Sequence, residues 1–347
     1  MLLQQLSDAR GISGFEREVR GIIGEAVGEL VDEQRVDTLG NLICVRKARR
    51  PVEGQPLKVM VAAHMDEIGL IVTGINRDGT VRFGKVGGID DRILLSKQVL
   101  VGEAAVPGVI GYRPIHLISR KDREAAPDVS RAAIDIGATS KGAAERLVKL
   151  GDPITFRTTF GALENGELRC VKGKALDDRA GCAVLVDLLR HDYAVDLYAV
   201  FTAQEEVGLR GARVAAFAIA PDLAFVLEGT ICDDLPKIDE DLSHVTEVGK
   251  GPAITFMDRS FIADRRLVDL LVDTAREEGI PYQFKKAAAG GTDAGAIHLS
   301  REGVPAVAVA VPCRNIHAPV SILSLNDLDN TSRLMVAALQ RLEGSLS

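Results

Sequence analysis

The sequence predicts an α/β protein in which helices cover both faces of a mostly parallel sheet, with a small β-rich domain inserted into it. Apolar runs without polar alternation, such as "LKVMVAAH" and "PAVAVAVPC", are typical of strands buried on both faces, and helical stretches separate them. Between residues 69 and 164 the chain changes to short β-type runs broken by Gly, Pro and Asp-Gly turns. We therefore expect a discontinuous domain of residues 1–68 and 165–347, interrupted by an inserted domain of residues 69–164.

The α/β part should begin with one amphipathic helix after "GISGFEREV", with Ser13 as N-cap and Glu16 as its capping-box partner. Two strands follow before the insertion, at residues 41–47 and 57–64. After it we expect strands and helices to alternate, with strands at 195–203, 221–230 and 305–313 and helices at 177–191, 209–219, 260–279 and 324–346. Within the insertion, β-type runs cover 69–88, 97–102, 106–112 and 151–160, and one short helix covers 140–150.

Composition narrows the class of protein. The chain has 347 residues, 46% of them hydrophobic and only 4% aromatic, so a large core must be built from Val, Ile, Leu and Ala. A net charge of −7 argues against a nucleic-acid or anionic-membrane partner. The sequence shows neither a basic, apolar leader at its start nor an apolar run of transmembrane length. Five scattered cysteines without a CxxC pair indicate reduced thiols and a cytoplasmic location.

Polar residues interrupt the apolar pattern where the predicted strands end. "VMVAAHMDEIGLIV" places His64 and two carboxylates inside an apolar run, where groups without partners would cost about several kcal/mol each. Ligands of open α/β sheets gather at the carboxyl ends of strands. The other candidates are the pair Glu205-Glu206, Glu228, His317, and an acidic pair at the start of a helix, Asp177-Asp178. Together these residues predict one constellation.

The donor types suit two divalent metal ions. Imidazole and carboxylate ligands favour zinc, cobalt or manganese. Three carboxylates and one bridging hydroxide cancel the four positive charges of two such ions. A further carboxylate is then free to act as a base on the water, whose pKa the metals lower towards neutrality. The pair Glu205-Glu206 can supply one ligand and one base.

The chain resembles the tetrahedral (TET) aminopeptidases, a family that includes glutamyl and deblocking aminopeptidases and members labelled endoglucanases. The motifs "AHMDEIG", "ALDDRAG", "TAQEEVGLRGA", "LEGT", "GGTDAGAIH" and "IHAP" occur in the family's order, and the resemblance spans the whole chain. It implies an exopeptidase that cleaves N-terminal residues from peptides with two metal ions. It also implies that the inserted domain serves assembly, with dimers building a hollow dodecamer.

The resemblance assigns roles to residues of this chain. Glu206 and His317 should hold one metal, His64 and Glu228 the other, and one aspartate of the acidic pair should bridge them, while Glu205 is the general base. Asp66 should lie in the second shell and accept the free N–H of His64. Thr292 and Asp293, in a Gly-rich turn before a helix, should lie in the second shell or the substrate pocket. Many relatives have Asp in place of Glu228, and the longer side chain could alter metal preference.

The bridging residue should be Asp177, because the wider metallopeptidase group places the bridging acid first in a pattern that aligns its small residues with Ala180-Gly181. In that group the peptide bond after the bridging acid is often cis, and we expect the same here. Asp178 should then accept hydrogen bonds from the start of the helix or from Arg179. The alternative without a metal-binding role is that one of the two aspartates only caps the helix.

Three other functions stay open from the sequence. A related dimetal amidohydrolase, such as a deacylase or a carboxypeptidase-like enzyme, could use the same scaffold, although the resemblance includes the insertion. A metal-binding assembly protein without catalysis is a second alternative, against which both Glu205 and Glu206 argue. A glycosidase is the third alternative, since paired carboxylates can cleave sugars. Against it, the carboxylates here are already assigned as metal ligands and as the general base.

Overall fold

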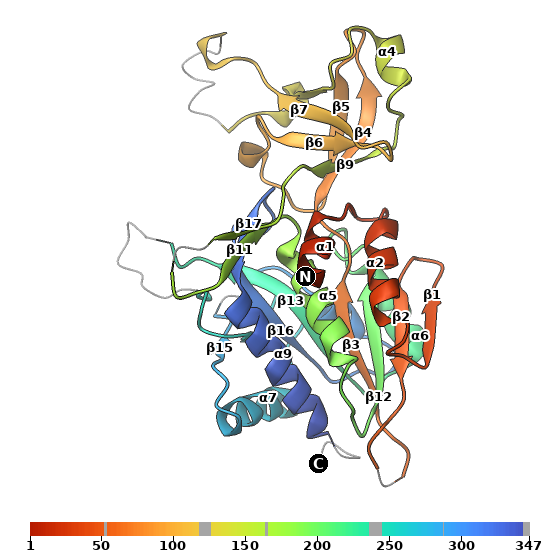
Figure 1. Ribbon diagram of the computed structural model, residues 1–347, viewed down its shortest axis with the longest axis vertical. Helices are drawn as coiled ribbons and strands as arrows, with labels where there is room; N and C mark the ends of the chain where they lie inside the picture. Colours follow the sequence, from red (N-terminus) through yellow and green to blue (C-terminus); the bar gives the residue numbers. More distant parts are fainter. Residues whose placement is uncertain (52–53, 118–125, 164–165, 236–244, 287, 343–347) are drawn as a thin grey trace.

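The computed structural model describes residues 1–347 except 52–53, 118–125, 164–165, 236–244, 287 and 343–347. A large sheet with helices on both sides forms one part of the molecule, and a small β-barrel stands at one end of it (Figure 1). The barrel strands run from Gly69 to Phe156, inside the segment expected to be an insertion. The second predicted domain boundary, at 164/165, lies outside the described residues.

The large sheet has the strand order β1-β2-β12-β3-β13-β16-β17-β11-β10. Its central strands are parallel, which confirms the predicted parallel sheet at its centre: β12 (Asp196–Thr202), β3 (Lys58–His64), β13 (Leu223–Cys232) and β16 (Ala306–Arg314). Antiparallel strands flank them: β1 (Glu33–Val36), β2 (Leu42–Arg46), β17 (Ser321–Ser324), β11 (Cys170–Gly173) and β10 (Gly161–Leu163). In addition, β14 (Ala253–Thr255) pairs with β16 and with β15 (Gln283–Phe284).

Helices pack on both faces of this sheet, as predicted. One face carries α1 (Leu2–Asp8), α2 (Arg17–Val27), α5 (Leu176–Leu188), α7 (Arg265–Glu277) and α9 (Leu325–Gln340), and the other carries α6 (Arg210–Ile219) and α8 (Ala294–Ile297). Successive residues of β3 alternate between the two cores: Val59 and Val61 pack against the first group, Met60 and Ala62 against the second. Both faces of the central strands are therefore buried, which explains why their sequences show no polar alternation.

The closed barrel has the strand order β4-β5-β8-β7-β6-β9. The strands are β4 (Gly69–Ile75), β5 (Val81–Val86), β6 (Gln98–Val101), β7 (Val106–Gly111), β8 (Ala133–Asp135) and β9 (Pro153–Phe156). Helix α4 (Lys141–Glu145) is shorter than predicted, and the 3-10 turns η1 (Asp91–Ile93), η2 (Ile115–Leu117) and η3 (Val129–Arg131) lie between strands. Leu70, Val99, Ile110 and Ile154 fill the interior, so the barrel has its own core.

The start of the chain corrects one prediction. It forms two helices rather than one, and α2 begins at Arg17 without a side-chain cap. Ser13 is not its N-cap: the hydroxyl donates to the buried Asp66 carboxylate at 2.6 Å. Glu16 instead accepts from the backbone N–H groups of Gly14 and Gln204. A long-range contact with a buried charge therefore overrides the local capping pattern.

The five cysteines are all free thiols. Burial raises the pKa of the Cys44 thiol to about 12 and that of Cys232 to about 11, so both are protonated at neutral pH. Within the described ranges, no helix combines the length and apolar character needed to cross a bilayer.

Candidate active site

The predicted site residues meet at the carboxyl ends of the central parallel strands. His64 is the last residue of β3, and Glu228 lies on the neighbouring strand β13. Glu205 and Glu206 follow β12, while His317 follows β16. These four strands are adjacent and point the same way, so their ends converge on one edge of the sheet. Asp177, at the start of α5, completes the group.

Two groups of ligand atoms share the Asp177 carboxylate. His64 Nε2 lies 3.3 Å from Asp177 Oδ1 and 3.0 Å from Glu228 Oε1. His317 Nε2 lies 3.6 Å from Asp177 Oδ2 and 3.7 Å from Glu206 Oε2. Within each group the ligand atoms all lie within 4.8 Å of one another. Each oxygen of Asp177 thus faces a different imidazole.

These spacings fit divalent metal ions. Tetrahedral ligands about 2.0–2.2 Å from a zinc ion stand roughly 3.3–3.6 Å from one another. The four separations between histidine nitrogens and carboxylate oxygens, from 3.0 to 3.7 Å, bracket that range. Glu228 Oε2 is also buried and has no hydrogen-bond partner among the described residues, as expected of a carboxylate whose natural partner is a cation.

The two aspartates of the acidic pair make different contacts. The Asp177–Asp178 peptide bond is cis. Asp178 turns away from the imidazole nitrogens and accepts hydrogen bonds from the Gly181 N–H, at 2.9 Å, and the His64 N–H, at 3.2 Å. Arg179 is not its partner, because that buried guanidinium donates to backbone carbonyls, including those of Met65 and Leu6. Asp178 therefore anchors the start of α5 to the end of β3.

Buried carboxylates dominate the electrostatics of the site. Burial, together with neighbouring carboxylates, raises the pKa of Glu205 and Glu228 well above the ordinary value and that of Glu206 to about 7. Burial opposes charge on His317, but the Asp177 and Glu206 carboxylates and the Gly88 carbonyl together outweigh it and raise the pKa of His317 to about 9. Burial thus disfavours the ionised forms of these carboxyl groups, and a bound cation would stabilise them.

Asp66 contacts His64 differently from the prediction. The nearest acceptor to His64 Nδ1 is the backbone carbonyl of Asp66, at 3.0 Å, whereas the Asp66 carboxylate is 3.5 Å away. The carboxylate instead accepts from the backbone N–H groups of Glu205, at 2.9 Å, and Glu206, at 3.1 Å. His317 Nδ1 likewise lies 3.0 Å from the Gly88 carbonyl. Backbone carbonyls therefore orient both imidazoles.

A cavity of about 180 Å³ opens beside the ligand groups, and Glu205 lines it together with Asp177, Glu228 and His317. Of the two residues expected in the second shell or the pocket, Thr292 lines this cavity and its hydroxyl donates to Asp258 at 3.1 Å. Asp293 is buried behind the cavity, where it accepts a 2.5 Å hydrogen bond from Thr202. Burial raises its pKa to about 6. The two neighbours therefore differ in their access to a ligand.

Sequence reasoning missed two polar residues in the wall of the cavity. Lys285 is buried, and its Nζ donates to the Ala289 carbonyl at 3.0 Å. The Thr230 hydroxyl is buried and has no hydrogen-bond partner among the described residues. Strand alternation could have found Thr230, because it shares a face of β13 with Glu228. No sequence pattern pointed to Lys285, whose position depends on how the loop after β15 folds.

Comparison with known proteins agrees with this geometry. Residues 40–334 match the M42 glutamyl aminopeptidase family. A provisionally named aminopeptidase of Acetivibrio thermocellus is 42% identical over 97% of this chain and 97% of its own length.

A TET aminopeptidase from a marine sediment Thaumarchaeota archaeon superposes with a TM-score of 0.93 and 38% identity, covering 99% of this chain and 97% of that one. The TET1 peptidase of Pyrococcus horikoshii, which assembles into a tetrahedron or an octahedral shell, has a TM-score of 0.85 and 35% identity, covering 98% and 99%. The chain therefore belongs to the M42 glutamyl aminopeptidase family, and it is a metal-dependent aminopeptidase.

Proposed function

We propose that this enzyme binds two divalent metal ions, zinc, cobalt or manganese, and uses them to release N-terminal residues from peptides. The observation that carries this proposal is the shared carboxylate: Asp177 belongs both to the group with His64 and Glu228 and to the group with Glu206 and His317. When bound, two such ions polarise the scissile carbonyl and lower the pKa of the attacking water.

Glu205 is the proposed general base. It belongs to neither ligand group, yet it lines the same cavity as Asp177, Glu228 and His317. Its backbone N–H is held by Asp66, which fixes the turn that carries it. In this role the Glu205 carboxylate takes a proton from the attacking water and passes it to the leaving amine.

The wall of the cavity favours an acidic N-terminal side chain. Lys285 is the one Lys or Arg among the described residues that line it, and no described carboxylate lies within ion-pair distance of its Nζ. The Thr230 hydroxyl in the same wall also lacks a partner within the described part of the chain. A buried ammonium gains most from a partner of opposite charge, so a substrate carboxylate would satisfy both groups.

Substrate preference tests this subsite directly. We expect a higher kcat/KM for peptides that begin with Glu than for those that begin with Leu or Lys. Lys285→Met should reduce the Glu-to-Leu ratio by about 10- to 150-fold, the equivalent of roughly 1.5–3 kcal/mol for a hydrogen bond to a charged group. The exposed neighbour Lys286 provides the matched control, Lys286→Met, which should keep the ratio. A wild-type enzyme that prefers Leu or Lys would contradict the proposal.

A comparison of blocked and free substrates separates the remaining functions. The aminopeptidase should cleave peptides with a free amino group and leave N-acetylated peptides and cellulose oligomers intact. Release of the acetyl group would identify a deacylase, release of C-terminal residues a carboxypeptidase, and cleavage of cellulose oligomers a glycosidase. Metal-loaded protein that cleaves none of these substrates would support an assembly protein.

We also propose that the chain forms a homo-oligomer, with dimers that build a dodecamer, in which residues 69–164 serve as the assembly domain. The similar TET1 peptidase of Pyrococcus horikoshii forms closed shells, and the barrel here exposes several large apolar side chains: Val109, Leu117, Leu147 and Leu150. A monomer by light scattering, with bound metal and full activity, would contradict this assembly. The free thiols favour a cytoplasmic location.

A further inference from the structure

Residues 9–16 connect α1 to α2 and contact segments that carry the proposed metal ligands. We call residues 9–16 the N-terminal strap. It contacts three of the segments that carry the proposed ligands, those of His64, Asp177 and Glu206. The Gly11 N–H donates to Glu67, and the Glu67 N–H donates back to the Gly11 carbonyl, three residues after His64. Arg179, two residues after Asp177, donates to the Ala9 and Gly11 carbonyls. Glu16 accepts from the Gln204 N–H, two residues before Glu206.

Ser13 makes the most direct of these connections. Its hydroxyl donates to Asp66 Oδ2 at 2.6 Å, and the same oxygen accepts from the Glu206 N–H. The other oxygen of Asp66 accepts from the Glu205 N–H. Asp66 is fully buried, so this carboxylate has no water to replace a lost donor. One hydroxyl of the strap thus fixes the carboxylate that holds the backbone of a proposed ligand and of the proposed base.

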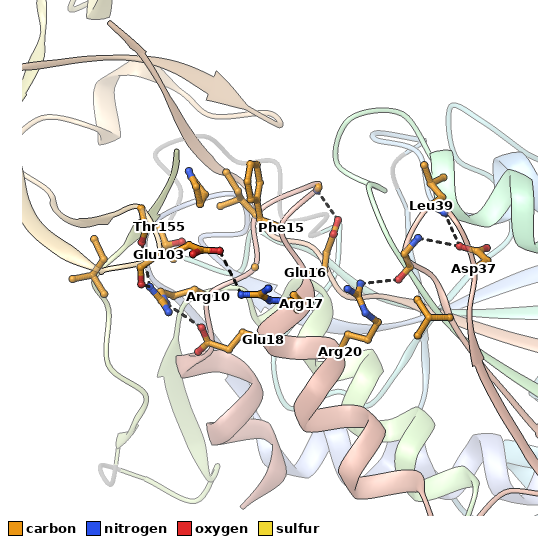
Figure 2. Close-up of a pocket in the computed structure, with 18 of the residues that line it drawn as sticks. Arg10, Phe15, Glu16, Arg17, Glu18, Arg20, Asp37, Leu39, Glu103 and Thr155 are labelled. Atoms are coloured by element: carbon orange, nitrogen blue, oxygen red, sulfur yellow. Dashed lines mark hydrogen bonds and ion pairs between the residues drawn. The ribbon is translucent and has the colours of Figure 1, made fainter. Parts of the chain in front are cut away.

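The outer side of the strap borders open space rather than packed protein. A cleft of about 730 Å³ lies between the strap, α2 and the barrel. Figure 2 shows Arg10, Phe15 and Glu16 of the strap at this cleft, with Glu103 and Thr155 of the barrel next to Arg10. On this side Arg10 donates to the Gly102 and Glu103 carbonyls, and on the inner side Ser13, Gly11 and Glu16 make the hydrogen bonds described above.

From these contacts we infer that Ser13 is a positioning residue for the metal site, acting through the Asp66 carboxylate on the Glu205-Glu206 turn. The inference rests on the proposed function in that it assigns the metal ligands as above. Partners in the second shell of a metal site typically change metal affinity or activity by about 10- to 100-fold. Ser13 acts one hydrogen bond further out, so we expect an effect near tenfold.

The test compares Ser13→Ala with a matched control, Ser7→Ala. Ser7 is also buried near the start of the chain, and its hydroxyl donates a 2.8 Å hydrogen bond to the Lys174 carbonyl, away from Asp66. Zinc affinity is measured by competition with a chromophoric chelator, alongside Tm, kcat and KM on a peptide with a free amino group. Ser13→Ala should bind zinc about tenfold more weakly and lose kcat by a similar factor, with KM little changed. Ser7→Ala should show a similar loss of Tm but keep zinc affinity within twofold.

Ser13→Thr keeps the hydroxyl and should restore zinc affinity to within about threefold of the wild type. Equal zinc affinities in Ser13→Ala and Ser7→Ala would overturn the inference, as would a threonine variant that is as weak as the alanine variant. Wild-type protein that binds zinc but releases no N-terminal residue would refute the proposed function instead. In that case the zinc affinities of the variants would still decide the role of Ser13.

Discussion

Gly229 offers a direct test of whether the position of Asp177 determines metal binding. It follows the proposed ligand Glu228 on β13, and its N–H donates to Asp177 Oδ1 at 3.2 Å. A Cβ atom added at this position would lie 2.8 Å from Asp177 Cβ and 2.9 Å from both its Cα and its Cγ. The substitution Gly229→Ala therefore pushes directly against the shared aspartate.

The size of the effect follows from these distances. Carbon atoms pack at about 3.5–4.0 Å, so the new methyl group overlaps Asp177 by roughly 0.7 Å. The clash includes backbone, and no flexible side-chain end can absorb it. Forcing an extra methyl into a packed site costs about 1–3 kcal/mol. If this cost falls on the metal-bound position of Asp177, affinity should drop by about 5- to 150-fold, since 1.4 kcal/mol is about tenfold.

Zinc affinity, measured by chelator competition, is the appropriate readout because it does not depend on turnover. Gly142→Ala is the matched control: this glycine lies in α4 of the barrel, and an added Cβ would meet nothing within 4 Å. It should bind zinc like the wild type. If Gly229→Ala also kept wild-type affinity at both sites while folded, Asp177 could not be a shared ligand held against β13, and the assignment would be refuted.

Three further predictions test the proposed chemistry. Glu205→Gln should keep its metal content but lower kcat by about 100- to 10,000-fold, and near-normal turnover with full metal content would contradict its role as base. His64→Ala and His317→Ala should lose metal, while a chelator should abolish wild-type activity and zinc, cobalt or manganese should restore it; full activity of metal-free protein would be incompatible with this mechanism. Zinc affinity should rise with pH from 6 to about 9, because the metal must displace protons from Glu206, with a pKa raised by burial to about 7, and from His317, with a pKa of about 9. Calorimetry in buffers of different ionisation enthalpy would measure this proton release, and a flat affinity would count against these ligands.

Much of the architecture could be predicted because it depends on local patterns. Apolar strands without alternation indicated a sheet covered on both faces, and polar residues at the strand ends indicated where side chains would meet. That rule found His64, Glu228 and His317, which the fold brings together with Asp177. Of the flanking antiparallel strands, β2 was predicted at residues 41–47, whereas shorter strands such as Cys170–Gly173 carry little pattern of their own and were not. The residues of the cavity wall could not be predicted either, because the position of Lys285 depends on how the loop after β15 folds.

The incorrect N-cap at Ser13 shows why a local pattern can fail at a functional site. Ser13 and Glu16 match the capping box, and such a cap stabilises a helix by about 0.5–2 kcal/mol. The buried Asp66 carboxylate competes for the same hydroxyl, and a hydrogen bond to a charged group contributes about 1.5–3 kcal/mol. The stronger interaction decides the outcome, so α2 begins without its cap and the hydroxyl holds Asp66. When a residue that matches a capping pattern does not cap its helix, its side chain therefore makes a more stabilising long-range contact. Here that contact supports the turn that carries Glu205 and Glu206.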